Sequence, residues 1–147
     1  MNRRIAKKKH LTKIKEHKYL RDLGLKEDDL PWKWDVDYKK RLENQEKIYG
    51  FNMTETYSLD LTLDLFLYER LMMYREKAKE VIDFTSHKYE YEGKTKNLGE
   101  LLDLMIDGLR FRLTKDKFDS FAWDEKDLKQ YNEPYQILAI IINDLWW

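Results

Sequence analysis

Two pairs of aspartates have the type and spacing that could hold a metal ion. Asp60 and Asp64 are four residues apart, and so are Asp103 and Asp107, with Glu100 one turn earlier. On a helix this spacing places both carboxylates on one face, and facing pairs on two helices can bind Mg²⁺ or Mn²⁺. However, Glu100 has no matching Glu-x-x-Glu upstream, and a chain with 28 acidic residues contains such pairs by chance. We therefore interpret them as solvated surface and helix-start charges, and predict no metal site and no cofactor.

Other residue types that carry out catalysis are scarce. The chain has no cysteine, which excludes disulfides and thiolate zinc sites. Its three histidines, His10, His17 and His87, stand without a carboxylate partner or a third ligand, and no serine has a convincing histidine partner. The five glycines are scattered, so no phosphate-binding loop is present. The sequence predicts no catalytic residues and a protein that is not an enzyme.

Positive charge is concentrated at the N-terminus. Residues 1–22 hold nine Lys or Arg and two acids, a net charge of +7, so the other 125 residues carry −7. Such an arm can contact phosphates and release counterions, which makes affinity fall with salt. The same cations can also lie in solvent or fold onto the acidic body, and we prefer this interpretation. The candidate nucleic-acid contacts are Arg3, Arg4, Lys7, Lys8, Lys9 and Lys13.

The elements that must position these charges are mainly helices. Residues of about 58–82 are apolar on most of the helix circumference, which predicts a central helix enclosed by its neighbours. Ser58 is its expected N-cap. Residues 98–115 carry a single apolar stripe, preceded by Asn97 and Glu100 in the arrangement of a capping box.

Two further elements complete the prediction. Residues of about 87–97 alternate around a Glu92-Gly93 turn, which indicates a small β-hairpin that must pack on the helices. A last helix at about 125–145 contains Pro134, which predicts a kink or a division into two helices.

The predicted fold class is mainly α: a helical bundle around the central helix, with the hairpin and a basic N-terminal helix at about 3–22. We divide the chain into a basic helical arm, 1–24, and a helical body, 25–147. No apolar run approaches the roughly 20 residues of a membrane span, and none follows the basic start as in a signal peptide. We expect a soluble, cytoplasmic protein.

A segment in the middle of the chain resembles one in small uncharacterised proteins of bacteriophage genomes. It comprises Gly50-Phe51, then Glu55-Thr56-Tyr57-Ser58-Leu59-Asp60, Thr62-Leu63, Phe66, Arg70-Leu71 and Tyr74, and the chain also shares their Leu-Trp-Trp ending. It departs from them at Tyr57, where Trp is commoner, and at Tyr68-Glu69, where a proline precedes the arginine. The resemblance implies a phage or prophage origin, and hence a bacterial host cell.

Charge separation and the implied origin together predict a phage-encoded, non-enzymatic protein that binds a host macromolecule. An inhibitor of a bacterial defence system, of the anti-CRISPR type, would use an acidic surface in place of nucleic-acid phosphates. Two alternatives remain open: a metal-dependent nucleotide hydrolase that uses the helix aspartates, and nucleic-acid binding through the basic arm. The candidate partner-binding residues are Asp35, Asp37, Glu100, Asp103, Asp107, Asp116, Asp119 and Asp124.

Overall fold

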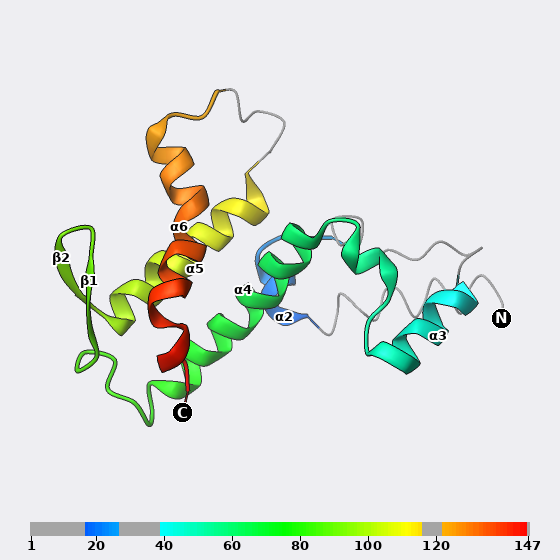
Figure 1. Ribbon diagram of the computed structural model, residues 1–147, viewed down its shortest axis with the longest axis horizontal. Helices are drawn as coiled ribbons and strands as arrows, with labels where there is room; N and C mark the ends of the chain where they lie inside the picture. The colour runs from blue at the N-terminus through cyan, green and yellow to red at the C-terminus, as the bar shows by residue number, and fades with distance from the viewer. Residues whose placement is uncertain (1–16, 27–38, 116–121, 147) are drawn as a thin grey trace. The chain divides into compact units, whose positions relative to one another are not determined.

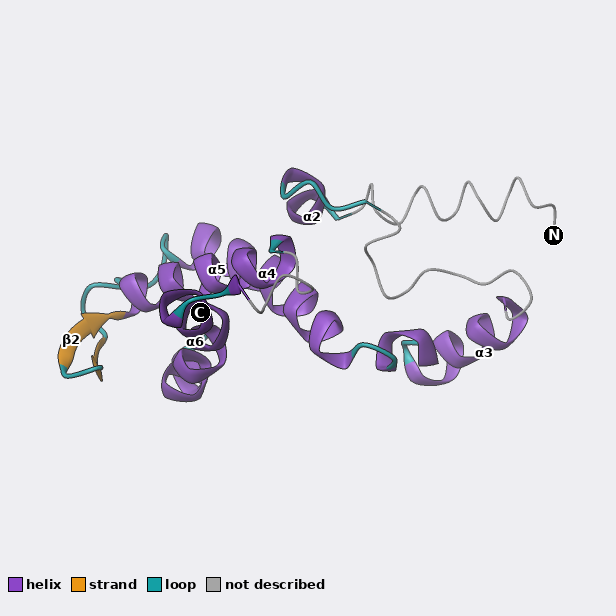
Figure 2. Ribbon diagram, turned by 90° about the horizontal axis from the view of Figure 1, so that it is seen from above, coloured by secondary structure: helices purple, strands orange, loops and turns teal. Residues whose placement is uncertain are grey.

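The protein is mainly helical with a two-stranded antiparallel hairpin, which confirms the predicted fold class (Figures 1 and 2). The computed structural model describes residues 17–26, 39–115 and 122–146. Among the described helices, none combines the length and apolarity needed to cross a lipid bilayer. The elements are α2 (Lys18–Asp22), α3 (Lys39–Tyr49), η3 (Met53–Thr56), α4 (Leu59–Ala78), β1 (Lys88–Tyr91), β2 (Lys94–Asn97), α5 (Leu98–Thr114), α6 (Glu125–Ile141) and η5 (Ile142–Asp144).

Contacts along the chain define two compact units, Met1–Phe66 and Leu67–Trp147. In the first unit, α2 lies inside the predicted basic N-terminal helix, whose residues before 17 are outside the described part of the chain. α2 and α3 are each followed by a glycine with positive φ, Gly24 at 89° and Gly50 at 83°. Glycine adopts this conformation without the steric cost that a Cβ would add. A glycine therefore ends each of these two helices.

Helix α4 has the predicted position but buries only one side. Leu65, Tyr68, Leu71 and Ala78 are buried, whereas Leu59, Leu63, Phe66 and Met73 are exposed. The expectation of a helix enclosed on most of its circumference thus differs from the structure. Apolar residues on two sides of a helix are compatible with full burial and also with an exposed apolar face, and the sequence pattern does not distinguish them.

Helix α5 is the most deeply buried helix of the second unit. Its N-cap is the predicted Asn97, whose side chain accepts a hydrogen bond from the Glu100 amide at 2.8 Å. The second half of the predicted capping box does not form, because the Glu100 side chain lies near Lys96 instead. Its buried stripe packs along α6, where Ile137 and Ile141 are also fully buried (Figure 1). The stripe consists of Leu98, Leu101, Leu102, Met105, Ile106 and Leu109, each with no exposed surface.

Gly108 on α5 lies directly against Pro134 on α6. A Cβ atom built on Gly108 would lie 2.4 Å from Pro134 Cγ and 2.9 Å from the Gln130 carbonyl oxygen. Pro134 has no N–H, so it cannot donate to the carbonyl of Gln130, four residues earlier. The helix nevertheless continues as one element through Pro134, with its N-terminus closed by a capping box of Asp124 and Asp127. The predicted division into two helices does not occur.

The hairpin forms at the predicted residues and packs on the helices. Tyr91 pairs with Lys94 across a turn in which Glu92 and Gly93 both have positive φ, 52° and 73°. Positive φ at both central residues is typical of a type I′ turn. The Tyr89 hydroxyl donates to Asp144 Oδ2 of η5 at 2.7 Å, and Lys129 Nζ of α6 lies 2.7 Å from Glu92 Oε2. These contacts stabilise a hairpin that is marginal in isolation.

Candidate functional site

The predicted acidic residues on α5 share one exposed side of the helix, and each pairs with a cation. Lys96 Nζ lies 3.9 Å from Glu100 Oε2. Arg75 Nη1 of α4 lies 2.6 Å from Asp103 Oδ1, and Arg110 Nη1 lies 3.3 Å from Asp107 Oδ1. Positive and negative side chains therefore alternate on this surface. A surface that imitates nucleic-acid phosphates would need an array of unpaired carboxylates, and these three residues do not form one.

Arg110 is held in place by Tyr68, a residue of α4 that belongs to the second unit. Its Nε donates to the Tyr68 hydroxyl at 3.2 Å, and its guanidinium lies 5.9 Å from the centre of the Tyr68 ring. The hydrogen bond to Tyr68, followed by the charges of Asp107 and Asp103, raises the pKa of Arg110 above its ordinary value, against the opposing effect of burial. The cation is thus fixed next to the carboxylates that were predicted to bind a partner.

The aspartates of α4 differ from each other. Asp60 is exposed in the first turn, where its charge favours the positive end of the helix dipole. Asp64 is fully buried, at 0% exposure, so the interpretation of this residue as solvated surface is wrong. Within residues 17–26, 39–115 and 122–146, no three His, Asp or Glu side chains are grouped closely enough to hold a metal ion.

Of the remaining predicted site residues, only Asp124 is described. It caps α6, where its side chain accepts from the Asp127 amide at 2.8 Å, so its role in the structure is to begin that helix. Asp35, Asp37, Asp116 and Asp119 lie outside the described residues. The predicted nucleic-acid contacts, Arg3, Arg4, Lys7, Lys8, Lys9 and Lys13, also lie outside them.

The middle segment that suggested a phage origin builds a hydrogen-bonded turn around Asn52. Asn52 is almost fully buried and caps η3, with its Oδ1 accepting from the Thr54 amide at 3.0 Å. Its Nδ2 donates to Glu46 Oε1 at 2.9 Å, and its own amide donates to Glu55 Oε2 at 3.1 Å. The Thr62 hydroxyl of α4 then donates to the Glu55 carbonyl at 2.6 Å. The Glu-Thr and Asp-x-Thr parts of the segment therefore position α4.

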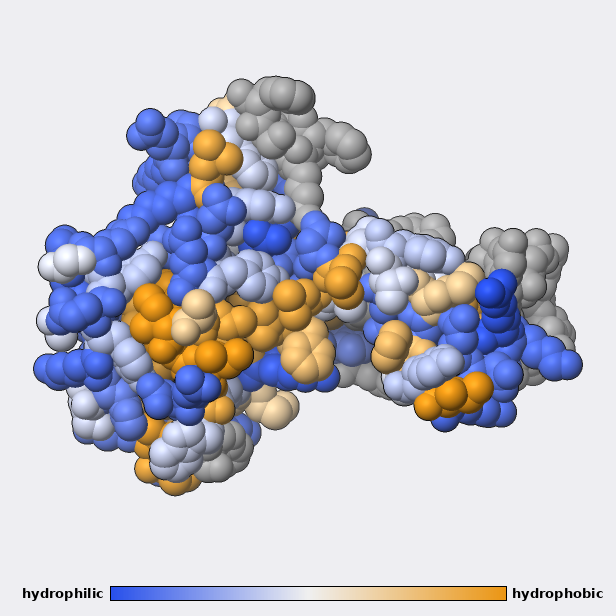
Figure 3. All heavy atoms as spheres, viewed as in Figure 1, coloured by the Kyte–Doolittle hydropathy of each residue, from blue (hydrophilic) through white to orange (hydrophobic). Residues whose placement is uncertain are grey.

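The residues of α4 that follow this turn form an exposed apolar face. Leu59, Leu63 and Phe66 follow at the spacing i, i+4 and i+7, which places them on one face of α4. They are 64%, 43% and 49% exposed, and Figure 3 shows apolar side chains along this helix. We call these three residues the α4 apolar face. In the described residues, seven of the thirteen large exposed apolar side chains lie between 48 and 66, so the exposure is concentrated in this segment.

No protein-family model matches this chain, and no curated protein and no solved structure is similar enough to it to count as a match.

Sequence reasoning did not select the α4 apolar face as a site, because it placed the same leucines in the core. One feature of the sequence could have indicated this face. Helix α4 carries apolar residues on more sides than a helix of a small unit can bury. The polar residues selected instead are those that ion pairs and helix caps use.

Proposed function

We propose that this chain is a phage-encoded, non-enzymatic protein that binds a host protein of a bacterial defence system through the α4 apolar face. The observation that carries the proposal is the exposure of Leu59, Leu63 and Phe66 on one side of a helix. Contiguous exposed apolar surface on a strongly charged protein marks an interaction site. A helix that presents residues i, i+4 and i+7 fits an apolar groove on its partner.

The resemblance of residues 50–74 to phage proteins supports the choice of a host partner. The Asn52 turn lies directly before α4, and the polar residues of the segment hold the start of this helix in place. The ion pairs at Glu100, Asp103 and Asp107 favour the apolar face over the acidic residues as the docking surface. An exposed ion pair contributes at most about 1 kcal/mol, so these carboxylates remain available for secondary contacts at the rim.

The proposal is tested in bacteria whose CRISPR nuclease targets an infecting phage. Expression of the wild-type chain should restore plaque formation, and Leu63→Glu should abolish the effect because it places a charge in the apolar contact. Leu63→Met is the matched control, which keeps the contact apolar and should retain activity. A triple variant with Glu100→Gln, Asp103→Asn and Asp107→Asn tests the acidic surface and should retain most of the effect.

Thermal unfolding of the same variants completes the experiment. Leu63→Glu should unfold at the wild-type temperature, because the side chain is already exposed. A marked loss of stability would mean that the chain itself covers this face, and the docking surface would be rejected. Failure of the wild-type chain to protect phage against any targeting nuclease would reject the function.

A further inference from the structure

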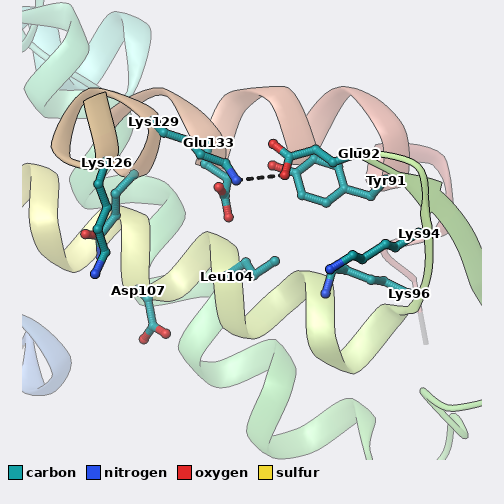
Figure 4. Close-up of a pocket in the computed structure, with 10 residues that line it drawn as sticks. Tyr91, Glu92, Lys94, Lys96, Leu104, Asp107, Lys126, Lys129 and Glu133 are labelled. Atoms are coloured by element: carbon teal, nitrogen blue, oxygen red, sulfur yellow. Dashed lines mark hydrogen bonds and ion pairs between the residues drawn. The ribbon is translucent and has the colours of Figure 1, made fainter. Parts of the chain in front are cut away.

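A second surface, in the unit Leu67–Trp147, has the chemistry of a small-molecule site. A cleft of about 530 Å³ lies between the hairpin, α5 and α6. Clefts of this size accommodate ligands as large as a nucleotide. Four lysines line it, and we call it the lysine cleft: Lys94 and Lys96 extend from β2 on one side, and Lys126 and Lys129 come from α6 (Figure 4).

Two of these lysines are available to a ligand. Lys129 is paired with Glu92 at 2.7 Å and Lys96 lies 3.9 Å from Glu100, whereas in the described residues the side chains of Lys94 and Lys126 form neither an ion pair nor a hydrogen bond. The carboxylate of Asp107, which also lines the cleft, lies 3.3 Å from Arg110. After these pairs are formed, the lining retains uncompensated positive charge. Lysine ammonium groups bind phosphate as point charges.

Polar groups in the interior of the cleft also restrict which ligands can bind there. Tyr91 lines the cleft and is only 7% exposed, and its hydroxyl is buried beside the carboxylates of Glu92 and Glu133 without a hydrogen bond of normal geometry among the described residues (Figure 4). A buried hydroxyl without a partner is costly, so such a group in a cleft indicates an absent ligand or water. Burial raises the pKa of Tyr91, and the charges of Glu133 and Glu92 together with hydrogen bonding toward their carboxylates raise it further, which keeps the hydroxyl a donor.

Glu133 supplies the complementary acceptor. Its side chain lies in the cleft between Lys129 and Leu104 and is 8% exposed (Figure 4). A buried carboxylate in this position repels a bare anion but accepts hydrogen bonds from hydroxyl or amino groups. Leu104 offers an apolar surface between the two groups of lysines.

We infer that the lysine cleft binds a small phosphate ester of a sugar or nucleoside. Lys94, on the β2 side, contacts the phosphate, Lys126 adds positive charge at the other end of the cleft, Tyr91 donates to a ligand oxygen, and Glu133 accepts from a sugar hydroxyl or an amino group (Figure 4). The ligand class follows from the combination of cations, a buried donor and a buried acceptor in one cleft. This inference does not depend on the proposed function, because all of the cleft residues lie outside the segment 48–66.

Calorimetric titration of the full chain tests the inference with AMP, glucose 6-phosphate, inorganic phosphate and a single-stranded DNA oligonucleotide. At least one of the two esters should bind more tightly than inorganic phosphate. A variant with Lys94→Ala and Lys126→Ala should bind that ester at least about tenfold more weakly. The matched control, Lys79→Ala with Lys88→Ala, removes two exposed lysines outside the cleft and should bind normally.

Tyr91→Phe separates a ligand contact from a structural role. Because its hydroxyl makes no hydrogen bond of normal geometry in the described part of the protein, the variant should unfold close to the wild-type temperature and still bind the ester more weakly. Equal binding of inorganic phosphate and the esters would show an adventitious ion only. Absence of ester binding, equal loss in the control variant, or binding of the oligonucleotide alone would overturn the inference.

Discussion

The contact between Gly108 and Pro134 gives the sharpest prediction about the second unit. Gly108→Ala would place a Cβ atom 2.4 Å from Pro134 Cγ, 2.7 Å from its Cδ and 2.9 Å from the Gln130 carbonyl oxygen. Carbon atoms in contact are ordinarily about 3.5–4.0 Å apart, so the helices must separate by roughly 1 Å. Neither a proline ring nor a backbone carbonyl can rotate away. The substitution therefore forces α5 and α6 apart.

The size of the effect follows from two opposing contributions. Overpacking a well-packed core costs about 1–3 kcal/mol, and the rigid neighbours place this site at the upper end. Alanine is about 1 kcal/mol more favourable than glycine inside a helix. We expect a net loss of about 2 kcal/mol in the free energy of unfolding, which corresponds to a fall of about 4–8 °C in Tm. Urea and thermal unfolding followed by circular dichroism measure both quantities.

Two further variants decide whether the helix contact is the cause. Gly99→Ala, near the start of α5, meets its nearest atoms at 3.3 and 3.4 Å and should change stability by less than about 1 kcal/mol. Combining Gly108→Ala with Pro134→Ala removes the ring, so part of the loss should be recovered, with a coupling energy of about 1 kcal/mol. The reasoning is refuted if Gly108→Ala is as stable as the wild type, or if its cost is unchanged without the proline ring.

Three other substitutions test local interactions. Asn97→Ala removes the α5 cap and should cost about 1 kcal/mol in urea unfolding, whereas Asn97→Asp should retain most of the stability. Asn52→Ala removes a buried side chain that accepts from Thr54 and donates to Glu46, and should lower the free energy of unfolding by about 2 kcal/mol; an unchanged Tm would contradict this role. Burial and the hydrogen bond to Asp144 raise the pKa of Tyr89 from 10.0 to about 12, so its contribution is complete below the pKa of the unfolded chain and is lost as pH rises through about 12. The stability advantage of the wild type over Tyr89→Phe should shrink across that range, and a constant difference in alkaline unfolding experiments would contradict it.

The sequence predicted those elements whose boundaries depend on neighbouring residues. Asn97 caps α5, and the Glu92-Gly93 pair forms the hairpin turn. Each of these signals acts within about four residues of the backbone groups it satisfies. Local chemistry was therefore sufficient to predict the fold class and most helix limits.

The relations between distant residues could not be predicted in the same way. Pro134 indicated an interruption of its helix, but Gly108, 26 positions earlier, lies directly against its ring in a continuous α6. Arg75 and Asp103 are 28 positions apart, and no spacing rule connects them. The candidate acidic site failed to form an unpaired array because its cations come from another helix as well as from its own.

The net charge of −7 outside the N-terminal arm therefore says little about how the described surface recognises a partner. Where carboxylates and cations alternate within 4 Å, their fields cancel over distances shorter than the Debye length of about 8 Å at physiological ionic strength. Apolar burial, in contrast, is not weakened by moderate salt. Binding through the α4 apolar face should thus keep its affinity between low and physiological salt, whereas binding through residues 1–22 should weaken steeply because each phosphate contact releases counterions. Measuring the affinity of one complex at both salt concentrations separates the two surfaces, and a steep decline that persists after removal of residues 1–22 would contradict docking through α4.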